Sequence, residues 1–210
     1  MKRSPSRASV RQLAGLLGIA VAALSGCALP QAQPDLTRFY VLAAAPAKTA
    51  AAPAEKRWQL GLRPVEAPPY LHNRAMVVRL GANEVRFAEE SRWAEPIEAG
   101  VARVLRETLE ARADVERVVP VTANAETPRD CDVLVRLQRC EGARDAGVAR
   151  FVATVEIYAP GDRPGRVARE TVSVEIPGWD GRDFADLARK LSAAVDQLAD
   201  RTVALLPPKS

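Results

Sequence analysis

The sequence predicts a mixed α/β fold, with a largely antiparallel sheet packed against two long amphipathic helices in a single domain. Short runs that alternate apolar and polar residues, bounded by glycine and proline, indicate strands. Two longer stretches place apolar residues three and four positions apart, which indicates amphipathic helices. The chain has 210 residues, a length typical of one domain once a targeting segment is set aside.

The first 26 residues predict a secretory signal peptide. Lys2, Arg3 and Arg7 precede an apolar run from Leu13 to Leu24, and small residues follow it. The run has about a dozen residues, fewer than the roughly 20 that a membrane-spanning helix needs. We therefore expect this segment to be removed rather than retained as an anchor.

The end of this segment, Leu24-Ser25-Gly26-Cys27, resembles a bacterial lipoprotein signal. In such proteins the cysteine thiol receives a diacylglycerol and its new amino group is acylated, for example with palmitate. This implies a signal peptide over residues 1–26, a lipidated tether over 27–36 and a domain over 37–208. Ala28 stands where an aspartate would signal retention in the inner membrane, so we expect an outer-membrane anchor facing the periplasm. The alternative is an ordinary signal with an incidental cysteine.

Removal of the signal peptide changes the net charge. The full chain has 30 basic and 26 acidic residues, and four of the basic residues lie in the signal. The mature chain is therefore balanced, and its overall charge gives no support for binding nucleic acid.

The amino-terminal half predicts four strands and one helix. The strands are expected at Thr37–Leu42, Arg57–Val65, Ala75–Leu80 and Glu84–Phe87. The last two would form a hairpin through Gly81-Ala82-Asn83, and a loop through Glu89-Glu90 would then lead to the helix. One helical face is formed by Ile97, Val101, Val104, Leu105, Thr108 and Leu109. Pro96 suits the first turn of this helix, and Glu95 and Glu98 suit its positive end.

The carboxy-terminal half predicts a brief strand at Val118-Val119 and then three extended runs. These are Cys131–Cys140, Val148–Tyr158 and Arg166–Ile176, and the turn at 161–165 makes the last two an antiparallel hairpin. The second long helix is marked by Phe184, Leu187, Leu191, Val195 and Leu198, with Asp183 as its N-cap, and ends before Pro207-Pro208.

Cys131 and Cys140 are expected not to form a disulfide. In a continuous strand their α-carbons would lie about 30 Å apart, whereas a bridge needs them within about 7 Å. Their odd separation would also place them on opposite faces of the sheet. We expect two buried or half-buried free thiols, and no metal site, because no histidines accompany the pair.

The sequence offers little for catalysis. His72 is the single histidine and follows Pro-Pro-Tyr-Leu in a predicted loop. Ser91, Ser173, Ser192 and Ser210 are the only serines after the signal, and none lies in a glycine-flanked nucleophile turn. No phosphate-binding glycine loop is present. The acidic pairs Glu89-Glu90 and Asp180/Asp183 are better explained as solvated residues and a helix cap. We expect a protein that is not an enzyme and has no cofactor.

One segment carries a more specific signal. The run from Asn83 to Ile97, which reads Asn-Glu-Val-Arg-Phe-Ala-Glu-Glu-Ser-Arg-Trp-Ala-Glu-Pro-Ile, resembles the auxiliary lipoproteins of ABC-type and MCE (mammalian cell entry) transport systems, the PqiC-like family. Thr37–Leu42 and Leu62–Leu71 match further stretches of that family in order, although Glu66-Ala67-Pro68 is a loose version. The recognisable similarity spans roughly Thr37 to Pro120.

The resemblance implies a non-enzymatic accessory subunit of an intermembrane phospholipid transport system. It would dock on the MCE protein and stay in the outer membrane through its acyl chains, and assembly into a homo-oligomer is left open. Two other functions remain: regulation of cell-wall synthesis or secretion-pore assembly, and direct carriage of a small lipid. A carrier needs a pocket of about 300–1,000 Å³, of which the sequence gives no sign.

The partner-binding residues are expected in the same segment, which we take as a loop. They are Arg92, Trp93, Glu95 and Pro96. Arginine and tryptophan are enriched in interface hot spots, and junction loops often carry function. The rival interpretation, favoured for Trp93, is a core plug that holds the helix on the sheet.

Overall fold

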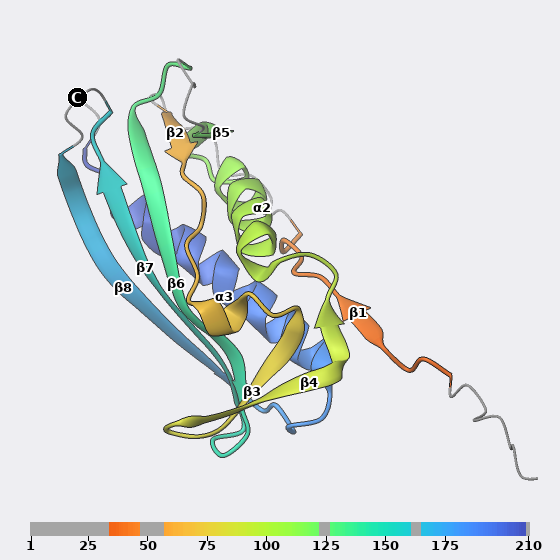
Figure 1. Ribbon diagram of the computed structural model, residues 1–210. Helices are drawn as coiled ribbons and strands as arrows, with labels where there is room; N and C mark the ends of the chain where they lie inside the picture. Colours follow the sequence, from red (N-terminus) through yellow and green to blue (C-terminus); the bar gives the residue numbers. More distant parts are fainter. Residues whose placement is uncertain (1–33, 47–56, 122–126, 161–164, 209–210) are drawn as a thin grey trace, which may run out of the picture. The chain divides into compact units, whose positions relative to one another are not determined.

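The sheet and helices belong to the compact unit Thr37–Ser210 of a computed structural model (Figure 1). The structure describes residues 34–46, 57–121, 127–160 and 165–208. The expected signal peptide and Cys27 lie outside these residues, as does most of the tether and of the turn expected at 161–165. None of the described helices is long and apolar enough to cross a membrane.

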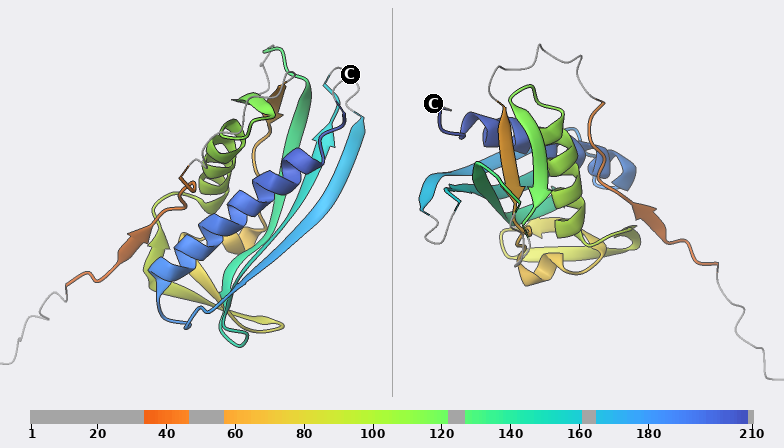
Figure 2. Two further views of the ribbon diagram at one scale, coloured as in Figure 1. Left: turned by 180° about the vertical axis from the view of Figure 1, so that it is seen from behind. Right: turned by 90° about the horizontal axis from the view of Figure 1, so that it is seen from above.

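Eight strands form one mixed sheet, and the two long helices cover one face of it (Figures 1 and 2). The strands are β1 Arg38–Tyr40, β2 Trp58–Leu62, β3 Ala75–Gly81, β4 Glu84–Trp93, β5 Val115–Pro120, β6 Cys131–Ala143, β7 Val148–Tyr158 and β8 Arg166–Pro177. The helices are α2 Ile97–Glu110 and α3 Phe184–Ala204, and a short 3₁₀ turn, η1, spans Pro69–Leu71. The predicted fold class is confirmed.

The order of the strands depends on β6, which has neighbours along both edges. β7 pairs antiparallel along nearly its whole length and continues into the β7–β8 hairpin. On the other edge, β2 pairs parallel with the start of β6 and β3 pairs parallel with its end. β5 then extends the sheet beyond β2, whereas β4 and β1 extend it beyond β3. The parallel pairs β1–β4 and β2–β5 join segments far apart in the sequence.

A β-bulge in β6 corrects the expected placement of the two cysteines. Gln138 is left out of the β6–β7 pairing, because the register jumps from Leu137 to Arg139. The extra residue turns the rest of the strand over. Cys131 and Cys140 therefore both face the core rather than opposite sides, and Cys140 pairs with Phe151. No disulfide joins the two cysteines in the described part of the chain, and both are buried.

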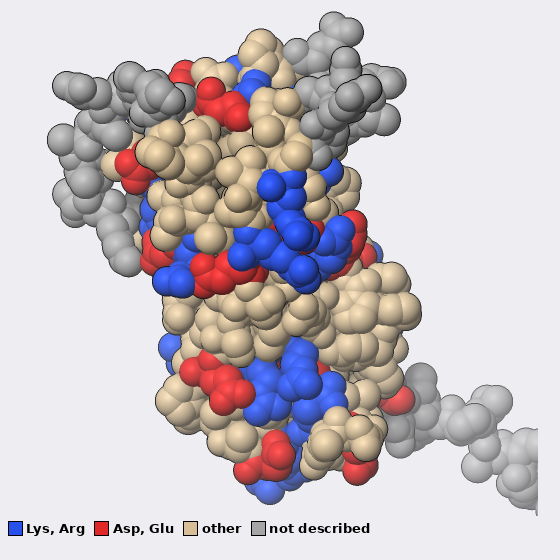
Figure 3. All heavy atoms as spheres, turned by 90° about the vertical axis from the view of Figure 1, so that its left-hand side faces the viewer, with Lys and Arg blue, Asp and Glu red and all other residues tan. Residues whose placement is uncertain are grey.

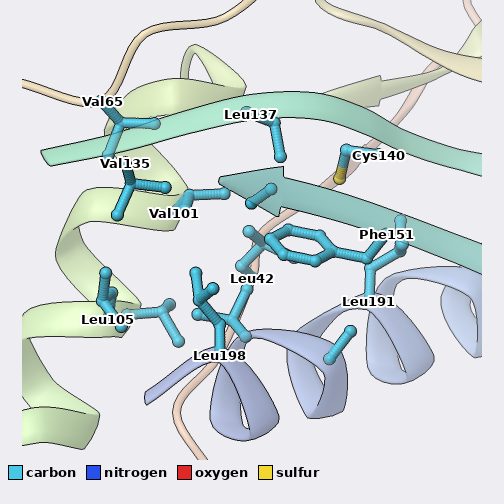
Figure 4. Packing of buried hydrophobic residues seen from close by; sticks show 14 of the residues in the cluster. Leu42, Val65, Val101, Leu105, Val135, Leu137, Cys140, Phe151, Leu191 and Leu198 are labelled. Atoms are coloured by element: carbon cyan, nitrogen blue, oxygen red, sulfur yellow. The ribbon is translucent and has the colours of Figure 1, made fainter. Parts of the chain in front are cut away.

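The core lies between the sheet and the helices, as Figure 4 shows for Phe151, Leu191 and Leu198. Every residue of the predicted α2 face is buried. In α3 the buried residues include Leu187, Leu191, Val195 and Leu198. Asp183 caps α3 as expected, accepting hydrogen bonds from the backbone nitrogens of Ala185 and Asp186 at 2.9 and 3.0 Å. Pro96 is the N-cap of α2 rather than a residue of its first turn.

The burial of the thiols makes a prediction about their reactivity. Burial raises the pKa of Cys140, with a further contribution from the neighbouring Glu141 carboxylate, so its thiolate is scarce at neutral pH. We expect both thiols to resist an aromatic disulfide reagent in the native protein. Both should react stoichiometrically after denaturation without reductant. Protection that persists until reductant is added would show a disulfide and contradict the register of β6.

Candidate interaction surface

The segment expected to bind a partner is not a loop. It is the end of strand β4, which pairs with the edge strand β1. β4 runs to Trp93, so the predicted loop at Glu89-Glu90 is wrong. The reason is that β1, which follows the tether in sequence, pairs parallel with this last part of β4. The pairing sets Phe39 beside Arg92 and Tyr40 beside Trp93. Because paired residues share a sheet face, Phe39 and Arg92 lie together on one side.

Beside Arg92, this side of β1 carries exposed apolar side chains. Phe39 is 62% exposed and Val41 is 53% exposed, a rare state for large apolar side chains in this structure. Both line a surface groove of about 580 Å³ between residues 39–46 and the first half of α3. The α3 side of the groove consists of Ala185, Ala188, Arg189, Ser192 and Ala193. We call the exposed side chains of Phe39 and Val41, with this groove, the β1 surface.

The groove is not the enclosed pocket that a lipid carrier would need. Its volume falls within the range of ligand sites, although it lies open on the surface between two elements rather than inside the core. Most of the α3 residues that line the groove are alanines. A groove lined by small side chains leaves no mark in the aromatic content of the sequence.

Trp93 points the other way and is buried. It is 4% exposed and belongs to the hydrophobic core that contains Ile97 and Leu42. Its backbone nitrogen donates to the carbonyl of Arg74 at 2.7 Å, which ties the end of β4 to the start of β3. An indole in this position packs between sheet and helix. The structure therefore agrees with the core-plug interpretation of this residue.

The other three predicted residues lie at the surface near β1. Arg92 and Pro96 are exposed, and the Glu95 side chain is 31% exposed. Glu95 lines a second hollow with Val41, Ala94 and Arg103. The backbone nitrogen of Ala94 donates to the Tyr40 carbonyl at 2.8 Å and joins this group to β1. The structure thus leaves Arg92 and Pro96 exposed and Glu95 partly exposed, and it buries Trp93.

Arg103, which the sequence analysis did not single out, ties these elements together. Its Nη2 donates to Oε1 of Glu95 at 2.6 Å and to the carbonyl of Leu42 at 2.8 Å. The hydrogen bond to Glu95 raises the pKa of Arg103, so the guanidinium stays charged. The segment after β1 is held on its other side by Ser192, whose Oγ accepts from the Ala43 nitrogen at 3.1 Å. Only the folded chain brings these residues together, so no local pattern marks them.

The sheet face away from the helices carries buried carboxylates that arginines neutralise. Asp132, Glu141 and Glu156 are at most 3% exposed. Glu156 is contacted by Arg136, Arg166 and Arg169, and Glu141 accepts from Arg79 at 2.5 and 3.1 Å. Burial alone would raise the pKa of Glu156, but hydrogen bonds from Tyr158, Arg136 and Arg166 outweigh it and lower the pKa.

These carboxylates therefore form structural ion pairs. Figure 3 shows basic and acidic side chains interleaved on one face of the domain, not a field of one sign.

The residues considered for catalysis are scattered. Ser91 and Ser173 lie in β4 and β8, and the Ser192 hydroxyl donates to the Ala188 carbonyl at 2.7 Å. His72 is exposed after η1, and its Nε2 lies 3.2 Å from the Ala67 carbonyl. Among the residues that the structure describes, no group of three or more histidine, cysteine or acidic side chains is placed to hold a metal ion.

Comparison with known proteins assigns the family. The model of the ABC-type transport auxiliary lipoprotein component matches residues 40–203. The chain belongs to this family. The match continues into the last turn of α3, well beyond Pro120, where the resemblance in individual motifs ends. The protein is thus a membrane-anchored, periplasm-facing lipoprotein of the transport auxiliary family.

Solved structures share the fold of this auxiliary lipoprotein. A crystal structure of a Xanthomonas campestris protein of family DUF330 has a TM-score of 0.65 at 19% identity, over 79% of this chain and 92% of that one. An uncharacterized protein has a TM-score of 0.60 at 14% identity, over 80% and 97% of the two chains. No curated protein matches the sequence.

The position of Trp93 predicts how two neighbouring substitutions differ. Trp93→Ala should lower the free energy of unfolding by about 3–5 kcal/mol, because it leaves a cavity in the core. Arg92→Ala should change it by less than about 0.5 kcal/mol, as is usual for exposed sites. Urea unfolding monitored by circular dichroism measures both values. Equal stability of the two variants would mean that the indole is not part of the core.

Proposed function

We propose that this auxiliary lipoprotein is a non-enzymatic accessory subunit of an MCE/ABC-type intermembrane phospholipid transport system. Lipid on Cys27 would hold it in the outer membrane, and its domain would dock on the MCE component in the periplasm. The observation that carries the proposal is the family match over residues 40–203, which covers nearly the whole described domain. Covalent lipid suits this role, because each buried methylene contributes about 0.8 kcal/mol to membrane attachment.

The geometry supports docking through the group formed by Arg92, Glu95 and Pro96. These residues are presented by a strand end and a helix start rather than by a mobile loop. The Arg103 hydrogen bonds and the β1–β4 pairing hold them in place before any partner arrives. A preorganised surface loses little conformational entropy on binding, and exposed arginine is a frequent interface anchor.

The anchor is tested by Cys27→Ala. A chain without the thiol has no acceptor for the diacylglycerol, so we expect an uncleaved precursor and no mature protein in the outer-membrane fraction. Metabolic labelling with a fatty acid and separation of the two membranes on a density gradient measure both effects. Cys140→Ala is the control, because it removes a buried thiol and leaves Cys27 intact. Normal labelling of Cys27→Ala would contradict lipidation at this site.

Docking is tested by Arg92→Ala, with Arg86→Ala as the matched control from the same strand. Both arginines are exposed in β4, but Arg86 lies toward its other end. Loss of an interface anchor of about 2 kcal/mol weakens binding about 30-fold, whereas the control should bind the MCE protein normally. Biolayer interferometry with the purified MCE periplasmic region measures both. Two variants that bind like the wild type would remove Arg92 from the docking surface.

A further inference from the structure

The β1 surface lies next to the lipid anchor along the chain. Ten residue steps separate Cys27 from Thr37, and a fully extended chain advances at most about 3.4 Å per step. The start of the folded domain is thus held within about 34 Å of the lipidated residue. No other element of the domain is as close to the anchor in sequence, because β1 is its first strand.

The chemistry of the β1 surface matches the outer part of a bilayer. Phe39 and Val41 offer exposed apolar side chains, and the groove beside them is walled by alanines. Arg189 lines the groove with a side chain that is 73% exposed, although it also pairs with Asp186. None of the described residues that line the groove is acidic, although Glu95 lines the neighbouring hollow with Val41. An apolar strip with a guanidinium at its rim suits acyl chains below and phosphate groups above.

We propose that the β1 surface contacts the phospholipid bilayer and forms a second attachment beside the acyl chains of Cys27. Phe39 and Val41 enter the interfacial region, and Arg189 meets the lipid phosphates. The contact gives the domain one orientation on the membrane, which a lipid on Cys27 alone does not set. The inference rests on the part of the proposed function that places lipid on Cys27, and it does not depend on the MCE partner.

The experiment uses the full lipidated protein in vesicles of phosphatidylethanolamine and phosphatidylglycerol. A small environment-sensitive dye is attached at Phe39→Cys, and brominated phospholipids serve as quenchers. Cys131 and Cys140 are buried and stay unlabelled in the native protein. Val167→Cys is the matched control, because Val167 is 51% exposed on β8, the opposite edge strand of the sheet. Val41→Cys repeats the measurement if Phe39→Cys folds poorly.

We expect the dye at position 39 or 41 to be quenched about twofold or more, since bromine on the acyl chains acts only on groups that enter the membrane. The dye at position 167 should be unaffected. Equal quenching at 39 and 167, or none at either, would overturn the proposal. So would a Phe39→Ser variant that loses binding to the MCE protein while position 39 is unquenched, because the surface would then belong to a protein interface. Protein that fails to float with the vesicles would instead show that the Cys27 anchor is absent.

Discussion

One long strand, β6, places nearly every other element of this domain. A strand has only two edges, and β7 occupies one of them along almost the whole length of β6. β2 and β3 must therefore share the other edge, β2 at the beginning of β6 and β3 at its end. The bulge at Gln138 lies between these two zones and keeps the apolar residues on the core side in both. The Gln138 carbonyl accepts from the Tyr70 hydroxyl at 3.0 Å, so the backbone oxygen of the bulged residue is paired.

The surface that we assign to interactions follows from this order. β3 carries β4 in a hairpin, and at its far end β4 pairs with β3 along one edge and with β1 along the other. That pairing turns Trp93 inward and Arg92 outward, so one strand end both plugs the core and offers a charged group. Arg103 from α2 then connects the strand end and the segment after β1. The surface is consequently tied to the core by both backbone pairing and side-chain hydrogen bonds.

Local periodicity was enough to predict both helices, the β7–β8 hairpin and the fold class. The residues of the predicted face from Ile97 to Leu109 follow helical spacing, and all of them are buried on one face of α2. The predicted strand ended too early, at Phe87, because Ala88-Glu89-Glu90 breaks the alternation of apolar and polar residues. The pairing of β4 with β1 joins segments some fifty residues apart, which local periodicity does not reveal. The prediction that the two cysteines lie on opposite sheet faces was wrong. The bulge adds one residue to the alternation of the strand and leaves no clear mark in the sequence. Arg92, Glu95 and Pro96 were predicted as binding residues in the segment that resembles the family, and this stays a prediction. Phe39 was not singled out, because it lies in a strand that is apolar on both sides.

The short β1 strand also decides how tension on the lipid anchor enters the domain. A pull along the tether reaches β1 first, and only a three-residue ladder holds it to β4. The next residues resist differently, because Leu42 is 1% exposed and its carbonyl is bound by Arg103, while the Ala43 nitrogen is bound by Ser192 of α3. A load that detaches β1 therefore stops at Leu42, where it must open the core. The weakly paired β1 therefore lies between the lipid anchor and the more firmly held segment at Leu42. A pull from the membrane can detach β1 without unfolding the domain.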